Sequence, residues 1–101
     1  MTTLFDVEAV QQFGRLATRT AGASARELIL NALKTHEAVR IDMTDMNLTP
    51  SFADECFGAL KEDLGLEEFK RRVHLTNLSE SASQLLSHVL SRRERKKLPS
   101  Q

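Results

Sequence analysis

Strand-type and helix-type hydrophobic patterns alternate along this chain, and the alternation constrains its fold more than any other feature. In residues 38–43, apolar side chains at Val39, Ile41 and Met43 alternate with polar ones at Arg40 and Asp42, a period of two that is typical of a half-buried strand. Residues 72–76 repeat the pattern, and residues 2–7 carry a weaker version of it. The sequence therefore predicts three strands, separated by segments with a different period.

Helical stripes fill those segments, with apolar side chains at intervals of three and four residues. The first stripe is Ala25, Leu28, Ile29, Ala32 and Leu33, the second Ala53, Cys56, Phe57, Leu60 and Leu64, and the third Ala82, Leu85, Leu86, Val89 and Leu90.

Capping patterns predict where these helices begin and end. Ser24 with Glu27 forms a capping-box pattern for the first helix, although an earlier start that includes Gly22 stays open. Gly65 predicts the end of the second helix. The third begins near Asn77 or Ser79, and Asn77 with Glu80 is a further capping-box pattern. Residues 8–20 fit either a short helical turn or an irregular strand.

This order of elements predicts an α/β domain. Alternating strands and helices imply a mostly parallel sheet of three to four strands with right-handed crossovers. Because the strands alternate rather than being apolar throughout, we expect two layers, with the helices mainly on one face. The other face would carry Arg40, Asp42, His74 and Thr76 and would meet water or a partner. We expect one domain over residues 1–101, with residues 92–101 a basic, frayed tail.

The charge balance and the single cysteine limit the class of protein. The 101 residues carry no net charge, which argues against a strongly basic nucleic-acid protein. Cys56 alone excludes an internal disulfide framework or a CxxC metal or redox motif. No apolar stretch is long enough to cross a bilayer, and the N-terminus lacks a signal-peptide core. We therefore expect a cytoplasmic protein without membrane contact.

The neutral total conceals an acidic middle and a basic end. Residues 37–68 are rich in Asp and Glu, whereas Arg92–Lys97 contains one acid among five bases. Cations suit the negative end of a helix dipole, so the basic run is expected to be a solvated helix end. Salt-sensitive nucleic-acid binding by this tail is the weaker alternative.

The most specific stretch is Pro50-Ser51-Phe52-Ala53-Asp54-Glu55, which follows the strand at 38–43. Ser51 with Asp54 fits a capping box worth about 1 kcal/mol of stability. The functional alternative is an anion, or a phosphate on Ser51, at the positive end of the helix dipole. Asp54 and Glu55 would oppose such a charge, so the sequence leaves both interpretations open.

Three other groups carry weaker signals. Asp42 and His74 would share the outer face of adjacent strands, where we expect an ordinary surface pair. Cys56 falls on an apolar stripe and is expected to be a core thiol. Four acids near the strand end would suit Mg²⁺ only if loop and cap roles did not already explain them. They are Asp42, Asp45, Asp54 and Glu55.

Two parts of the chain resemble the bacterial STAS-like family of unknown function. Residues 41–46 match its hydrophobic-Asp-hydrophobic strand, and residues 49–60 match its Ser-Phe-small-Asp-Glu helix start. The segment Thr18-Arg19-Thr20 is also similar. The resemblance extends over roughly residues 15–80.

This resemblance implies a relation to STAS domains, the fold of sulphate transporters and anti-sigma-factor antagonists. In antagonists of that class, a partner kinase phosphorylates a serine at the start of the helix after this strand. Ser51 falls at about that position, but Pro50-Ser51-Phe52-Ala53 replaces the Asp-Ser-Ser-Gly of the antagonists. STAS-like members are also associated with histidine-kinase-type ATP-binding proteins, which implies a protein partner of that kind.

We therefore expect a non-enzymatic, regulatory protein-interaction module that docks its partner through the strand-to-helix corner at Ser51. The alternative is a small nucleotide- or anion-binding protein that uses the same helix N-terminus. No cofactor or metal is predicted, and a homodimer through an edge strand or the apolar residues near Phe5 and Phe13 stays open. The candidate partner-binding or phosphoacceptor residues are Ser51, Asp54 and Glu55, supported at the strand end by Asp42, Thr44 and Asp45.

Overall fold

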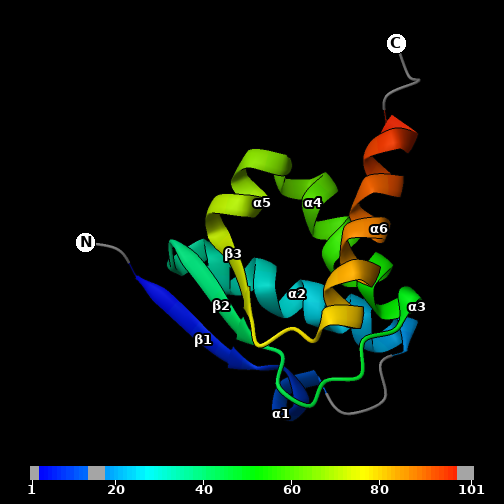
Figure 1. Ribbon diagram of the computed structural model, residues 1–101. Coiled ribbons are helices and arrows are strands. Elements are labelled where there is room, and N and C mark those ends of the chain that lie inside the picture. The colour runs from blue at the N-terminus through cyan, green and yellow to red at the C-terminus, as the bar shows by residue number, and fades with distance from the viewer. Residues whose placement is uncertain (1–2, 14–17, 98–101) are drawn as a thin grey trace.

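The computed structural model describes residues 3–13 and 18–97, and for residues 92–97 it describes the backbone only. Its sheet consists of three strands, all parallel, in the order β1-β2-β3 (Figure 1). Their bounds are Leu4–Glu8 for β1, Ala38–Asp42 for β2 and Val73–Thr76 for β3. The register pairs Asp6 with Arg40 and Arg40 with His74. The three predicted strands and their parallel arrangement are confirmed.

The helices follow the predicted order with two additions. Helix α1 spans Ala9–Phe13, α2 spans Arg19–Thr35, α5 spans Leu66–Arg72 and α6 spans Glu80–Lys97. Between β2 and α5 the chain forms one helical segment of three parts: α3 (Pro50–Ala53), the π-helical η1 (Asp54–Gly58) and α4 (Ala59–Leu64).

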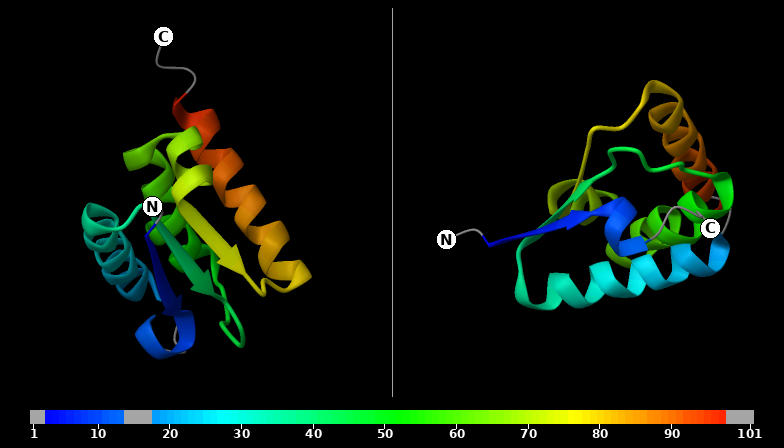
Figure 2. Two further views of the ribbon diagram at one scale, coloured as in Figure 1. Left: turned by 90° about the vertical axis from the view of Figure 1, so that its left-hand side faces the viewer. Right: turned by 90° about the horizontal axis from the view of Figure 1, so that it is seen from below.

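The molecule has two layers, because the helices lie behind one face of the sheet and leave the other face open (Figure 2, left). Side chains of Val39, Ile41 and Phe57 are fully buried between the layers. Arg40 and His74 point to the open face and are exposed, as the alternation predicted. The predicted small two-layer α/β fold with helices mainly on one side is confirmed.

Helix α2 begins earlier than the capping-box pattern at Ser24 predicted. Thr18 is its N-cap and accepts a hydrogen bond from the Ala21 N–H at 3.1 Å, so Ser24 lies inside the helix. Gly22 is therefore a helical residue, in agreement with the alternative start. The ambiguous segment 8–20 resolves into the end of β1, helix α1 and the start of α2, with residues 14–17 outside the described part.

Helix α5 was missed because its sequence shows little apolar periodicity. Only Phe69 is buried on it, and six of its seven residues are charged or exposed. Gly65, with φ of 88°, ends the preceding helix as predicted, and a new helix starts directly after it. Arg72 is consequently the last residue of α5 rather than the first of a strand.

The capping-box prediction at Asn77 is wrong, whereas the start at Ser79 is confirmed. The Ser79 hydroxyl accepts from the Ala82 N–H at 3.1 Å, and α6 begins at Glu80. Asn77 adopts a left-handed conformation, with φ of 59°, and donates to Asp42 instead. Helix α6 runs to Lys97, while fraying of the basic end stays a prediction because its side chains and residues 98–101 lie outside the described part.

No helix in residues 3–13 and 18–97 has the length and apolar character that a bilayer crossing requires. Phe5 and Phe13 both pack against the core, and the Phe13 ring lies 5.9 Å from that of Phe52. A homodimer through these two side chains would therefore gain less apolar area than the sequence suggested.

Candidate functional site

Thr49, not Ser51, caps the helix at the candidate site. Thr49 has extended backbone angles, and its hydroxyl accepts from the Phe52 N–H at 3.2 Å. Pro50 occupies the first helical position, where its fixed φ and missing N–H are favourable. The predicted Ser51–Asp54 capping box is therefore wrong, because Pro50 takes the first helical position and the cap lies two residues earlier, at Thr49.

This shift leaves Ser51 without a capping role. Its side chain is half-buried at the second helical position, and its hydroxyl bonds to none of the residues that the structure describes. The first turn also offers few amides to an anion. Pro50 has no N–H, the Phe52 N–H is taken by Thr49, and the Ala53 N–H donates to the Thr49 carbonyl at 2.9 Å.

Asp54 and Glu55 lie one turn further and face the N-terminus of α2. The Arg19 guanidinium lies 2.8 Å from the Glu55 carboxylate and 3.8 Å from that of Asp54. Both carboxylates are less than one third exposed, whereas the Arg19 side chain is 60% exposed. The structure thus brings the segment Thr18-Arg19-Thr20 beside the Ser51 helix start, an arrangement that the sequence did not indicate.

Gly22 permits this close approach of the two helices. A Cβ at Gly22 would lie 2.9 Å from the Phe52 carbonyl oxygen and 3.1 Å from the Glu55 Cβ. We define the Ser51 corner as Thr18, Arg19, Ser51, Asp54 and Glu55, the surface over this contact.

The corner rests on a π-helical stretch. Segment η1 begins at Asp54 and carries Glu55 on its partly exposed side, while Cys56, Phe57 and Gly58 are buried. π-helical turns are rare and occur frequently at functional sites, since they change the direction in which side chains leave the helix. The hydrophobic spacing fits an α-helix here, so the sequence carried no signal for it.

Asp42 belongs to a second group at the carboxyl end of the sheet. Its Oδ1 accepts from the Thr44 N–H at 3.0 Å, the Thr44 hydroxyl at 2.5 Å and the Asn77 amide at 2.9 Å. The Asn77 bond, and then the two bonds from Thr44, hold the pKa of Asp42 below its usual value. Asp45 follows in a left-handed conformation, with φ of 60°. Asp42 and Thr44 thus fix the loop that leads toward α3.

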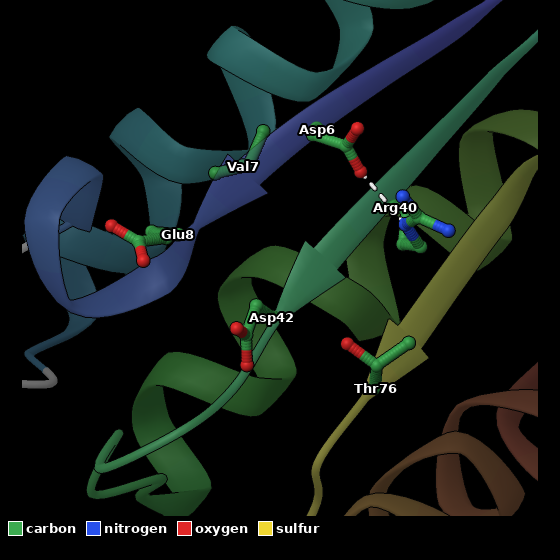
Figure 3. Close-up of a pocket in the computed structure, with 6 residues that line it drawn as sticks. All are labelled: Asp6, Val7, Glu8, Arg40, Asp42 and Thr76. Carbon is green, nitrogen blue, oxygen red and sulfur yellow. Dashed lines mark hydrogen bonds and ion pairs between the residues drawn. The ribbon is translucent and has the colours of Figure 1, made fainter.

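The open face beside this group is hollowed (Figure 3). A cavity of about 440 Å³ lies there. Glu8 and Asp42 line it and also line a smaller cavity of about 190 Å³. Arg40 lines the larger cavity and pairs with Asp6 at 2.7 Å (Figure 3). The lining residues of the larger cavity are Asp6, Val7, Glu8, Arg40, Asp42 and Thr76.

Asp6 and Glu8 are the site residues that sequence analysis missed. Their signal was the alternation Asp6-Val7-Glu8, which places two acids on one face of the first strand. The pattern of this strand was too short to predict that its polar face forms part of a site.

Cys56 and His74, the remaining candidates, lie outside the Ser51 corner and outside the lining of the larger cavity. Cys56 is fully buried, as predicted, and burial raises the pKa of its thiol. His74 lies opposite Arg40 on the open face, one row away from Asp42. Within the described ranges, no three or more His, Cys, Asp or Glu side chains gather in a way that would hold a metal ion.

This arrangement, a three-stranded parallel sheet with one helical layer and a strand-loop-helix corner, is consistent with a STAS-like fold. The model of the STAS-like domain of unknown function (DUF4325) matches residues 21–82, and the chain belongs to this family. A search of curated proteins found no match, and a search of solved structures found none either. The matched range includes β2, the helical segment at Ser51 and β3.

Proposed function

We propose that the chain is a non-enzymatic protein-interaction module whose partner docks on the Ser51 corner. The observation that carries this proposal is the ion pair of Arg19 with Glu55 and Asp54. It joins two segments that resemble the STAS-like family at one partly exposed place. Since Ser51 is not the helix cap, stability does not explain the serine, and its hydroxyl is available to a partner.

The family resemblance suggests the partner, a histidine-kinase-type ATP-binding protein. Such a protein would meet a surface with two acids, one arginine and one hydroxyl on two helix starts that pack closely together. A phosphate on Ser51 would be repelled by Asp54 and Glu55 within the same turn and attracted by Arg19. Phosphorylation would therefore compete for Arg19 and change the charge pattern that the partner meets.

The nucleotide- or anion-binding alternative has less support from this geometry. The Ser51 N–H is the one amide of the first turn of α3 that no described residue occupies. Phosphate cradles use several backbone N–H groups, and their loops are rich in glycine. The chain between Met43 and Ser51 contains none. Nucleotide binding would become the better-supported function if a nucleotide raised the melting temperature of the protein strongly in a thermal-shift assay.

The test is a pull-down from extract of the native cell, followed by titration calorimetry with the purified partner. Wild type should retain a histidine-kinase-type ATP-binding protein, and Ser51→Asp and Glu55→Arg should weaken its binding. The matched control Glu67→Arg changes an exposed acid on α5, away from the corner, and should bind as wild type does (Figure 1).

The double variant Arg19→Glu/Glu55→Arg separates surface chemistry from stability. It reverses the ion pair, so the helices should stay joined while the surface pattern is inverted. Binding should stay weak in the double variant although its unfolding midpoint returns toward that of wild type. Retention of no partner by wild type, or equal retention by Ser51→Asp and Glu55→Arg, would refute docking at this corner.

A further inference from the structure

Strand β1 is an edge strand, and no described element is paired with its outer side. The Thr3 carbonyl accepts from the Ala38 N–H at 3.2 Å, on the inner side. Successive residues of a strand direct their N–H and C=O groups to opposite sides. Leu4, Asp6 and Glu8 therefore present theirs at the outer edge, where an unpaired row of backbone groups is a template for another strand.

The same three residues turn their side chains to the open face, because Val7 is buried and Phe5 packs against the core. An added strand would have its own alternate side chains beside Leu4, Asp6 and Glu8. The Asp6 side chain is 62% exposed, and Leu4 is, with Leu66, an exposed large apolar residue of the described part of the chain. The edge thus offers two acids and one apolar contact in a fixed spacing.

The hollow of the open face adds room and charge beside this edge. Its single cation, Arg40, is already paired with Asp6, while Glu8 and Asp42 contribute two further negative charges among its lining residues. The volume of about 440 Å³ admits a long side chain from a neighbouring strand (Figure 3). Charge complementarity therefore favours a Lys or Arg from the occupant.

A second copy of this chain fits the edge poorly. Antiparallel pairing of two β1 strands in full overlap would place Asp6 opposite Asp6 of the second copy. A shift toward the carboxyl end would place Asp6 opposite Glu8. Like charges directly opposite one another destabilise a strand pair, so both of these registers favour a basic occupant over β1 itself.

We propose that the outer edge of β1 takes up an extended basic segment of a protein partner as a fourth strand. Backbone hydrogen bonds to Leu4, Asp6 and Glu8 supply affinity, and Lys or Arg side chains at alternate positions supply specificity. One of these cations enters the hollow near Glu8 and Asp42. This surface is separate from the Ser51 corner, and the inference stands whether or not that corner docks a partner.

The probe is a fluorescent, end-blocked peptide with the sequence Thr-Lys-Val-Lys-Val-Lys-Thr, titrated at low ionic strength and followed by polarisation. Two control peptides carry Glu in place of Lys, or N-methyl groups on alternate amides. The basic peptide should bind and slow amide exchange at Leu4, Asp6 and Glu8 in NMR spectra. Both control peptides should bind much more weakly.

Charge-neutral variants of the protein test the role of the acids. Asp6→Asn/Glu8→Gln should weaken binding of the basic peptide about fivefold, the size expected for two exposed cross-strand charge pairs. Glu67→Gln/Glu80→Gln removes the same charge from exposed positions on α5 and α6 and should leave binding unchanged.

The inference is overturned if Leu4, Asp6 and Glu8 exchange as fast with the basic peptide as without it. It is also overturned if the N-methylated or the acidic peptide binds as tightly as the basic one. In the first of these cases Asp6 and Glu8 serve only to keep other strands away from the edge.

Discussion

At the residue scale, the absence of a side chain at Gly22 allows the two helix starts of the Ser51 corner to pack closely. In an exposed helix position, Gly22→Ala would add about 1 kcal/mol of stability through helix propensity. Here the new Cβ would lie 2.9 Å from the backbone oxygen of Phe52, which has no freedom to rotate away. Overpacking of this kind costs about 1–3 kcal/mol. Gly22→Ala should therefore lower the urea midpoint, while the control Ser24→Ala, at an exposed position of α2, should change stability by less than about 0.5 kcal/mol.

Asp42 gives a pH-dependent prediction at the same scale. Its folded pKa lies below the unfolded value of about 3.9, so its contribution to stability is complete above that value. The contribution is lost as the pH falls through the lowered folded pKa. Asn77→Gly keeps the left-handed backbone and removes the main hydrogen bond, so the pKa of Asp42 should rise toward its ordinary value.

Carboxyl-carbon NMR titration measures this change directly. Asn47→Gly, in the exposed loop after Asp42, is the matched control and should leave the pKa of Asp42 unchanged. If both variants titrate as wild type does, the Asn77 amide does not stabilise the Asp42 carboxylate.

At the scale of elements, the helix start at α3 depends on Thr49 and Pro50. Thr49→Ala removes the capping hydroxyl and should cost about 1 kcal/mol of unfolding free energy. Ser51→Ala should cost much less, because that hydroxyl bonds to none of the described residues. Denaturant unfolding of the two variants compares them, and a larger loss in Ser51→Ala would restore the serine as the cap.

Arg72 links the end of α5 to the C-terminus of α2 and to the loop that follows it. Its guanidinium donates to the carbonyls of Leu33 at 2.8 Å, His36 at 3.1 Å and Glu37 at 2.8 Å. Arg72, at the end of α5, thereby satisfies carbonyl groups at the C-terminus of α2, which have no partner within that helix. Arg72→Met should cost about 2 kcal/mol, since hydrogen bonds from a charged donor are strong and two of these three are partly buried.

Arg71→Met is the matched control for this prediction. Arg71 is exposed and pairs with Glu68 on the same helix, so its loss should change stability by less than about 0.5 kcal/mol. Equal effects of the two substitutions would show that Arg72 acts only as a surface charge.

The elements differ in how far the sequence predicted them. Residues 38–43 and the stripes of α2 and α6 have strong periods, and their existence and type were predicted. Helix α5 buries only Phe69 and lacks a stripe. The π-helical stretch at Asp54 keeps the apolar spacing of an α-helix, so the sequence pattern did not reveal it. The cap of α3 is Thr49 because Pro50 occupies the first helical position.

At the scale of the whole molecule, one sheet face is covered and the other is open. Parallel sheets usually have both faces covered, so we expect an open polar face with hollows to be covered by a second molecule. Its polar character followed from the alternation at Arg40 and Asp42. The contact of Arg19 with Glu55, which spans 36 positions of sequence, had no local signal and required the packed structure.

The same long-range contact gives a prediction for the assembly of the two helices. If the ion pair and the Gly22 contact join α2 to α3, Arg19→Ala should speed amide exchange in both helix starts together. The expected stability loss is small, about 0.2–1 kcal/mol, because the pair is partly exposed. Faster exchange in α2 alone would indicate that the two segments open independently.

The most direct test of docking at the Ser51 corner is an NMR titration of isotope-labelled protein with the purified partner. We predict that the largest amide shift changes fall at residues 18–22 and 51–55. Ser51→Asp and Arg19→Glu/Glu55→Arg should reduce these changes at equal partner concentration, and Glu67→Arg should not. Unchanged amides at both segments, with shifts confined to α5 or α6, would contradict docking at this corner.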